Sequence, residues 1–276
     1  MLGPKQGPAL RQIQYSKLQS TIIEVHFQGK ELGVGQTWED WLAEMEHNLR
    51  SWYEALPPDE DKISTELSFL QGLTDLNRPS PRMPFPSQYS LLVAFKAACG
   101  SAHLYQQHIT TGFFRCPWLV AHNTFASAMV ALFCLRYGGE KICERWSAAE
   151  IFQMTKMFTM NLLSLSGQGW AEISKYAGTY ERLLGPLLDV VFSNTSSLDR
   201  TFNPEQDAEL ARLIYPGPAH LEKLRFGNRT PWDEDFQVFD PAMFNWDDDV
   251  PIDISWGDNL AFDNLDPSGS RSYFSQ

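Results

Sequence analysis

The stretch from Trp38 to Pro57, WEDWLAEMEHNLRSWYEALP, decides the fold class of this chain. Its apolar residues recur at spacings of three and four, which places them along one face of an α-helix. These residues are Trp38, Trp41, Leu42, Met45, Leu49, Trp52, Tyr53 and Leu56. Thr37 and Asp40 form a T-x-x-D cap that predicts where the helix begins, and Pro57-Pro58 predicts where it ends.

Helical periodicity continues on both sides of this stretch. A helix is expected from about Leu10 to Val25, followed by the glycine-rich run GKELGVGQ. Further along, Ser87 is the expected N-cap of a long helix, and the capping box of Ser147 and Glu150 opens another. Pro117 is the expected first residue of an almost uncharged helix that should end at Gly138-Gly139.

The last long helix is expected from about Gln168. Its buried face would carry Trp170, Ile173, Ala177, Tyr180 and Leu184. Gly185-Pro186 should kink or break it, and residues 204–214 form one short helical candidate.

Two further segments interrupt the predicted helices. Residues 58–68 are acidic and polar, and residues 78–87 carry several prolines that predict a rigid, extended crossing loop. Because no long stretch from Arg11 to Phe192 alternates with period two, the sequence predicts an all-α protein, an irregular helical bundle.

Length and composition limit the classes of protein that are possible. A chain of 276 residues that is 43% apolar can bury a sizeable core. The four cysteines lie in apolar or helical stretches with no secretory signal upstream, which favours a reduced intracellular compartment. The longest apolar run, Thr124–Leu135, is too short to cross a bilayer, so no membrane segment is predicted.

The charge is distributed unevenly along the chain. The net charge is −12, and the stretch from Pro231 to Asp266 holds 11 of the 34 acidic residues and none of the 22 basic ones. The rest of the chain is nearly neutral. Binding to a phosphate backbone depends on clustered Lys and Arg, so no direct DNA binding is expected from this chain.

Aromatic residues are interspersed with these acids. They are Trp232, Phe236, Phe239, Phe244, Trp246, Trp256 and Phe262. Mutual repulsion of the acids keeps such a chain expanded, and this composition is typical of disordered activation segments that bind transcription coactivators. The alternative is that the aromatic side chains pack back onto the helical body while the acids face water.

The sequence divides into four regions on these criteria. Residues 1–9 are expected to be disordered, and residues 10–195 to form an α-helical domain. Residues 196–230 would be a linker, and residues 231–276 a largely disordered acidic-aromatic tail that serves as the activation segment.

The sequence carries no complete catalytic or metal-binding motif. Cys99 and His103 lie one turn apart but supply only two ligands, whereas a zinc site needs three or four. Cys116 and His122 lack the third group that would make a Cys-His nucleophile. Pro251 and the lack of basic partners argue against a magnesium site at Asp247–Asp249. The sequence therefore predicts no catalytic residue, metal or cofactor.

Two alternative functions remain open. Apolar helices could enclose a small-molecule pocket, as in an all-α enzyme or sensor, with His103, His122 and Asn123 as its polar groups. The chain could instead be an adaptor that binds another protein through apolar surface of the helical domain. Self-association through that domain is a related possibility.

The order of motifs resembles the helical middle homology region of fungal zinc-cluster transcription factors. The matching features, across residues 10–195, are an amphipathic helix ending in W-x-x-x-L-P, an R-P-S-P loop, a helix containing A-A, and a buried helix leading to a tryptophan-anchored one. The residues that carry the resemblance are Trp52, Pro57, Arg78, Pro79, Ser80, Pro81, Ala97, Ala98, Trp118 and Trp170.

This resemblance implies a nuclear transcription regulator, an activator whose helical domain modulates the activity of its acidic end. The family's six-cysteine DNA-binding cluster is not found in this sequence. The resemblance therefore implies either a truncated gene product or a protein that acts through a DNA-bound partner.

Overall fold

Helices follow one another along the part of the chain that the computed structural model describes, residues 7–57, 61–111, 117–192 and 203–214. No strand occurs among these residues, so the protein is all-α as predicted. The helices are α1 (Pro8–Phe27), α2 (Trp38–Glu54), α3 (Lys62–Asn77), α4 (Gln88–Thr111), α5 (Pro117–Arg145), α6 (Ala148–Gly167), a 3-10 turn η1 (Ala171–Ile173), α7 (Ser174–Phe192) and α8 (Pro204–Ile214). Since α1 begins at Pro8, the helical body begins slightly before the expected boundary at residue 10.

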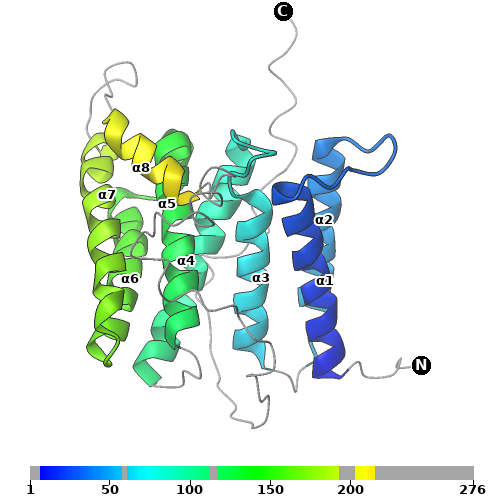
Figure 1. Ribbon diagram of the computed structural model, residues 1–276, viewed down its shortest axis with the longest axis horizontal. Helices are drawn as coiled ribbons and strands as arrows, with labels where there is room; N and C mark the ends of the chain where they lie inside the picture. Colours follow the sequence, from blue (N-terminus) through cyan, green and yellow to red (C-terminus); the bar gives the residue numbers. More distant parts are fainter. Residues whose placement is uncertain (1–6, 58–60, 112–116, 193–202, 215–276) are drawn as a thin grey trace, which may run out of the picture. The chain divides into compact units, whose positions relative to one another are not determined.

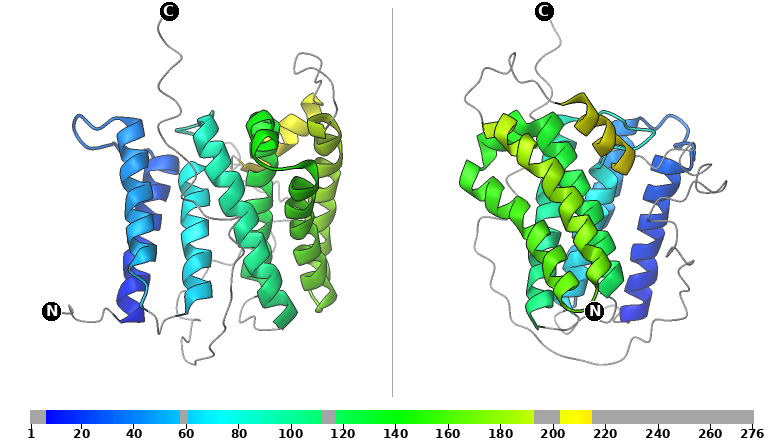
Figure 2. Two further views of the ribbon diagram at one scale, coloured as in Figure 1. Left: turned by 180° about the vertical axis from the view of Figure 1, so that it is seen from behind. Right: turned by 60° about the vertical axis from the view of Figure 1, so that its left-hand side comes forward.

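The helices α1 to α7 run side by side, and successive helices alternate in direction (Figure 1). Most of them pack against their neighbours in the chain, and α4 also contacts α6 while α5 contacts α7. The short α8 lies obliquely across the ends of this array, against α5 (Figure 2). The central helices α4 and α5 therefore supply most of the core, and α1 and α2 form one edge.

The predicted helix starts are confirmed by their capping bonds. The Thr37 hydroxyl oxygen accepts a hydrogen bond from the Asp40 amide at 3.1 Å. Ser147 accepts from the amide of Glu150, whose carboxylate accepts from the Ser147 amide at 2.7 Å, which completes the capping box. Ser87 accepts from the Ser90 amide at the start of α4. Each bond satisfies an amide that has no partner within its helix.

Helix α3 was not predicted from the sequence. Asp61 caps it by accepting hydrogen bonds from the amides of Ile63 and Ser64. Its buried residues include Phe69, Leu70, Leu73 and Leu76, which face α2 on one side and α4 on the other. Two buried faces conceal the single-stripe periodicity by which an amphipathic helix is recognised.

The prediction that Gly138-Gly139 ends the fifth helix is wrong, because α5 continues to Arg145. A Cβ atom at Gly138 would lie 3.2 Å from Cβ of Leu91 on α4, and one at Gly139 would lie 3.4 Å from Cγ2 of Val191 on α7. The two glycines therefore allow α4 and α7 to approach α5 closely and do not terminate it.

The prediction for the last long helix is wrong at the first residue of its predicted face. Trp170 precedes η1 and is 44% exposed, whereas Ile173, Ala177, Tyr180 and Leu184 are buried as expected. Pro186 lies inside α7 and does not break it. The preceding residue is Gly185, which has no Cβ atom to clash with the proline ring, and buried leucines on both sides hold the helix in place.

Helix α5 is long and apolar enough to span a bilayer by length and composition, and 67% of its most apolar 18-residue window is buried within the protein. Its contacts with α4, α6, α7 and α8 account for this burial. Core helices of bundles have the same apolar character.

The short helix predicted at residues 204–214 is confirmed. It falls within the region expected to be a linker, yet Leu210 and Ile214 are buried and α8 contacts α5. The helical body therefore extends to Ile214 and does not end at residue 195. The tail, residues 231–276, lies outside the described residues.

Candidate functional site

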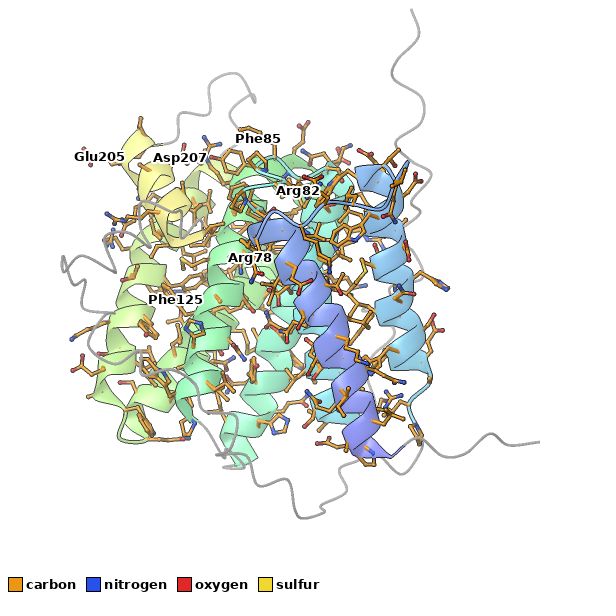
Figure 3. All side chains as sticks on the ribbon, turned by 45° about the vertical axis from the view of Figure 1, so that its right-hand side comes forward. Arg78, Arg82, Phe85, Phe125, Glu205 and Asp207 are labelled. Atoms are coloured by element: carbon orange, nitrogen blue, oxygen red, sulfur yellow. The ribbon has the colours of Figure 1, made fainter. Side chains whose placement is uncertain are left out.

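The R-P-S-P loop, residues 78–87, lies at the end of the helical array where α1 ends and α2 begins. Pro79 and Ser80 are buried, Pro81 is exposed, and Arg78 is partly buried. Figure 3 shows Arg82 and Phe85 beyond Arg78, toward the end where Glu205 and Asp207 of α8 also lie. This loop is the candidate functional site because it brings together three segments that are far apart in sequence.

Ser80 is the structural centre of the loop. Its amide donates to the Met83 carbonyl and its carbonyl accepts from the Met83 amide, both at 3.1 Å. The Ser80 hydroxyl oxygen also accepts from the Met83 amide at 3.0 Å and lies 2.8 Å from Nδ1 of His26 at the end of α1. These bonds close a tight turn and join it to α1.

His26 is buried and sits among aromatic rings. The ring centroids of Trp38 and Trp41 lie 5.2 and 5.6 Å from its imidazole. Burial lowers the pKa of His26 to about 4, the charges of Arg78 and Arg82 add to this effect, and a hydrogen bond with the Leu76 backbone opposes it. The imidazole is therefore neutral near pH 7, and the direction of its hydrogen bond with the Ser80 hydroxyl depends on which ring nitrogen carries the proton.

The outer part of the loop rests on Trp38. The Trp38 indole N–H donates to the Met83 sulfur at 3.3 Å, and the Arg82 guanidinium lies 5.6 Å from the centroid of the Trp38 ring. Arg82 also donates to the Lys30 carbonyl at 2.6 Å. Phe85, between two prolines, is 82% exposed. The loop therefore presents one large apolar side chain to solvent while its base is fixed.

Arg78 connects the loop to α8. Its Nη2 donates to the carbonyl oxygen of Ile214 at 3.2 Å, and its guanidinium lies 5.6 Å from the Phe27 ring centroid. Asp75 lies 3.9 Å from its Nη1. Burial raises the pKa of the Asp75 carboxyl, while Arg78 acts in the opposite direction. Arg78 thus ties the last residue of α8 to α3 and α1.

Trp52 occupies a different place, on the face of α2 that packs on α1. Its indole N–H donates to the Arg11 carbonyl at 3.1 Å, and Arg11 Nη2 donates back to the Trp52 carbonyl at 2.9 Å. The guanidinium lies 5.0 Å from the Trp52 ring centroid. Pro57 follows α2 and is half-buried. Trp52 therefore joins two helices and takes no part in the loop.

The other residues of the family resemblance lie in the second half of the body. Trp118, near the start of α5, has its ring centroid 5.8 Å from that of Tyr176 on α7. Ala97 and Ala98 are buried on α4. Trp170 is half-exposed between α6 and η1. The structure thus gathers Arg78, Pro79, Ser80 and Pro81 into one site and leaves the tryptophans dispersed.

The side chains proposed for a ligand pocket have protein partners. The Asn123 amide donates to the Tyr105 hydroxyl at 3.3 Å, and His103 Nε2 lies 3.2 Å from the Gln107 amide nitrogen. Burial lowers the pKa of both His103 and His122. The structure therefore places Asn123 and His103 in two separate hydrogen bonds, the first between α5 and α4 and the second within α4.

The two buried cysteines, Cys99 on α4 and Cys134 on α5, show no activation. Burial raises the pKa of Cys99 well above that of a free thiol, and it also raises that of Cys134, so both are protonated. Among residues 7–57, 61–111, 117–192 and 203–214, no group of three or more His, Cys, Asp or Glu side chains could hold a metal ion. Cys116 and Asp247–Asp249 lie outside these ranges.

The tail residues of the predicted partner-binding site also lie outside the described residues. They are Trp232, Phe236, Phe239, Phe244, Trp246, Trp256 and Phe262. Their role rests on composition.

The arginines that hold α8 were not predicted from the sequence. Arg136 of α5 pairs with Asp207, and Arg182 of α7 pairs with Glu209. A signal for the first was present, since Arg136 is the charged residue that interrupts the apolar run of α5. A charge at such a position requires an acidic partner from elsewhere in the chain.

Comparison with known proteins gives no match for this chain: no family model, no curated protein and no solved structure matches it.

Proposed function

We propose that this protein is a nuclear, non-enzymatic transcriptional regulator, in which an α-helical body carries an acidic-aromatic tail that binds coactivators. One observation carries the proposal: between Pro231 and Asp266, seven aromatic residues are interspersed with 11 acidic residues and no basic residue. Acids at this density keep aromatic side chains in solution and available to a partner. They also steer encounter with a basic surface.

The proposed mechanism is folding coupled to binding. A short segment around Phe239 or Trp246 would order as its aromatic side chain enters an apolar groove of the coactivator. Ordering the segment costs conformational entropy, and this cost lowers the affinity of the complex. The binding can therefore be fast and reversible.

The charge pairing of the body supports action through a DNA-bound partner. Several basic side chains of the described residues are engaged with acids of the same chain, among them Arg50 with Glu46, Arg136 with Asp207 and Lys156 with Glu181. Phosphate binding would require free clustered cations. The helical body would then serve as the scaffold that joins the DNA-bound partner to the tail.

The R-P-S-P loop supports a regulatory role for the body. Through Arg78 it contacts the last residue of α8, from which the chain continues toward the tail. Phe85 offers an exposed apolar contact on the same loop. A partner that binds this loop would act next to the last residue of α8.

A reporter assay tests the proposal. The full chain is fused to a foreign DNA-binding module upstream of a reporter gene. We expect activation by the natural chain and at least a fivefold loss when Trp232, Phe239, Trp246 and Trp256 are replaced by alanine. The matched control replaces Ser268, Ser270, Ser272 and Ser275 by alanine and should retain activation.

The proposal fails if the natural fusion does not activate. It also fails if the four aromatic substitutions leave activation unchanged at equal protein level.

A further inference from the structure

One face of helix α6 is apolar and open to solvent. The helix lies beside α7, at the end of the helical array opposite α1 and α2 (Figure 1), and its buried face packs on α4, α5 and α7. On its outward face, Phe152, Met160 and Leu163 are 48%, 51% and 52% exposed. A single exposed apolar residue is ordinary on a protein surface, whereas several along one helix indicate an interaction surface.

These side chains belong to a continuous strip, which we call the α6 strip. Its members are Ala149, Phe152, Lys156, Met160, Leu163 and Gly167. At 3.6 residues per turn, all of them fall within about 80° around the helix axis. Ala149 and Gly167 are exposed, and a Cβ atom at Gly167 would meet nothing within 4 Å. The strip therefore has a small residue at each end and large side chains between them.

The one charge of the strip is neutralised by the neighbouring helix. Lys156 donates to both carboxylate oxygens of Glu181 on α7, at 2.8 and 2.9 Å. Its ammonium nitrogen lies 5.8 Å from the centroid of the Phe152 ring, so its aliphatic stem adds to the apolar surface. Glu150, the other charged residue of α6, belongs to the capping box outside the strip. The strip thus has no net charge that would repel an identical strip.

The spacing of the strip suits an antiparallel copy of itself. With a rise of about 1.5 Å per residue, a second copy centred on residue 158 brings Leu163 of that copy within about 1.5 Å of the level of Phe152. Met160 then faces the Lys156 stem of the second copy, and Ala149 faces Gly167. A two-fold axis forms each of these contacts twice, and the small residues at the ends let the two helices approach closely.

The area of the strip determines how strong such a contact can be. Residues 149–167 span about 27 Å of helix, and at a width of about 10 Å each copy would bury roughly 300 Å². A standard interface buries about 800 Å² per partner. The strip therefore fits a reversible dimer with a dissociation constant of about 10 μM or weaker.

We propose that the α6 strip binds the α6 strip of a second copy of this chain in an antiparallel, two-fold symmetric dimer. Selection of a different protein relies on charges complementary to those of that protein. This strip is neutral, and its residues match their own reversed order. The contact lies within the helical body and does not rest on the proposed function of the tail.

Sedimentation velocity of the full chain tests the proposal, over concentrations from about 2 to about 500 μM. We expect the weight-average sedimentation coefficient to rise with concentration. Added salt should strengthen the association, because both copies carry a net charge of −12 and no ion pair crosses the strip.

Substitutions on two helices locate the contact. Phe152→Glu with Leu163→Glu should raise the dissociation constant at least tenfold, because dimerisation would bury the new charges. The matched control is Leu10→Glu with Ile13→Glu on α1, at side chains that are 46% and 51% exposed, and it should leave the dissociation constant unchanged. Circular dichroism reports whether both variants retain their helices.

Disulfide cross-linking tests the antiparallel arrangement, with Cys116 and Cys143 replaced by serine. Chains carrying Phe152→Cys, mixed with chains carrying Leu163→Cys, should form a linked dimer under mild oxidation. Neither variant should link to itself, because identical positions of the two copies lie roughly 15–18 Å apart along the helix axis.

The proposal is overturned if the chain sediments as a monomer at every concentration, which would leave the strip to a different protein or to the tail of the same chain. It is equally overturned if the glutamates on α6 act no more strongly than those on α1. Self-linking of either cysteine variant as readily as the mixture would also overturn it. None of these results depends on reporter activation, so failure here is distinct from failure of the proposed function.

Discussion

The hydroxyl oxygen of Ser80 lies 2.8 Å from Nδ1 of His26, a residue 54 positions earlier in the chain, and both side chains are buried. This contact joins the end of α1 to the loop that leads into α4. The same hydroxyl also accepts a hydrogen bond from the Met83 amide, so one oxygen links the turn of the loop to α1.

Replacing Ser80 by alanine should therefore destabilise the protein. The His26 ring would lose its hydrogen bond with this hydroxyl, and the Met83 amide would keep only its bond to the Ser80 carbonyl. We expect the free energy of unfolding to fall by about 1–3 kcal/mol in urea titrations at pH 7. Ser16→Ala, at an exposed position of α1, is the control and should change it by less than about 0.5 kcal/mol.

His26 should make stability depend on pH. Its pKa is about 4 in the folded protein and about 6.5 when unfolded, so the unfolded state takes up the proton first as the pH falls. The stabilisation is complete above about pH 6.5 and is lost progressively toward pH 4, up to about 3 kcal/mol. In His26→Asn, urea midpoints measured across this range should fall less steeply than in the natural protein. If the urea midpoints of both proteins fell equally steeply with pH, His26 would not be the residue responsible for this pH dependence.

The glycines of α5 and α7 should respond oppositely to alanine. Gly138→Ala places a methyl group 3.2 Å from Leu91 and should cost about 1–3 kcal/mol of the free energy of unfolding. Gly178→Ala, on an exposed position of α7 where a Cβ atom meets nothing within 4 Å, should add about 0.5–1 kcal/mol. Thermal melting of both variants measures the contrast, and a gain at Gly138 would show that α4 and α5 are less closely packed.

Trp52→Phe should weaken the packing of α2 against α1 and so lower the free energy of unfolding. The substitution removes the indole donor that the Arg11 carbonyl accepts from and weakens the contact with the guanidinium. We expect a loss of about 1–2 kcal/mol in the free energy of unfolding. Trp170→Phe is the matched control, since Trp170 is half-exposed, and a loss of equal size there would refute the distinction.

Local signals in the sequence predicted where helices begin. Thr37, Ser87, Pro117 and Ser147 each act within four residues of their own position, so a capping residue can be recognised without knowing the tertiary structure. Helix ends were harder to predict. The sequence predicted a helix end at Gly138-Gly139 and a kink or break at Gly185-Pro186, but both pairs lie within helices. At the first pair, the helix packs against Leu91 and Val191. At the second pair, the flanking leucines are buried.

The candidate site was predictable only in part. The prolines of residues 78–87 predicted a rigid loop, and Arg78 and Ser80 are among the residues that carry the family resemblance. Their partners could not be predicted, because His26 lies 54 residues from Ser80 and Ile214 lies 136 residues from Arg78. Such contacts are set by the packing of whole helices and leave no periodic trace in the sequence.

The order in which the helices pack also bears on how the chain folds. From α1 to α7, each helix contacts the next helix in sequence or the one after it, so most core contacts close short loops. Chains dominated by such local contacts fold rapidly, because little loop entropy is lost before each contact forms. Helix α8 is the exception, since it passes back over α7 to reach α5. Its docking would therefore follow the assembly of the other helices and form the last step of folding.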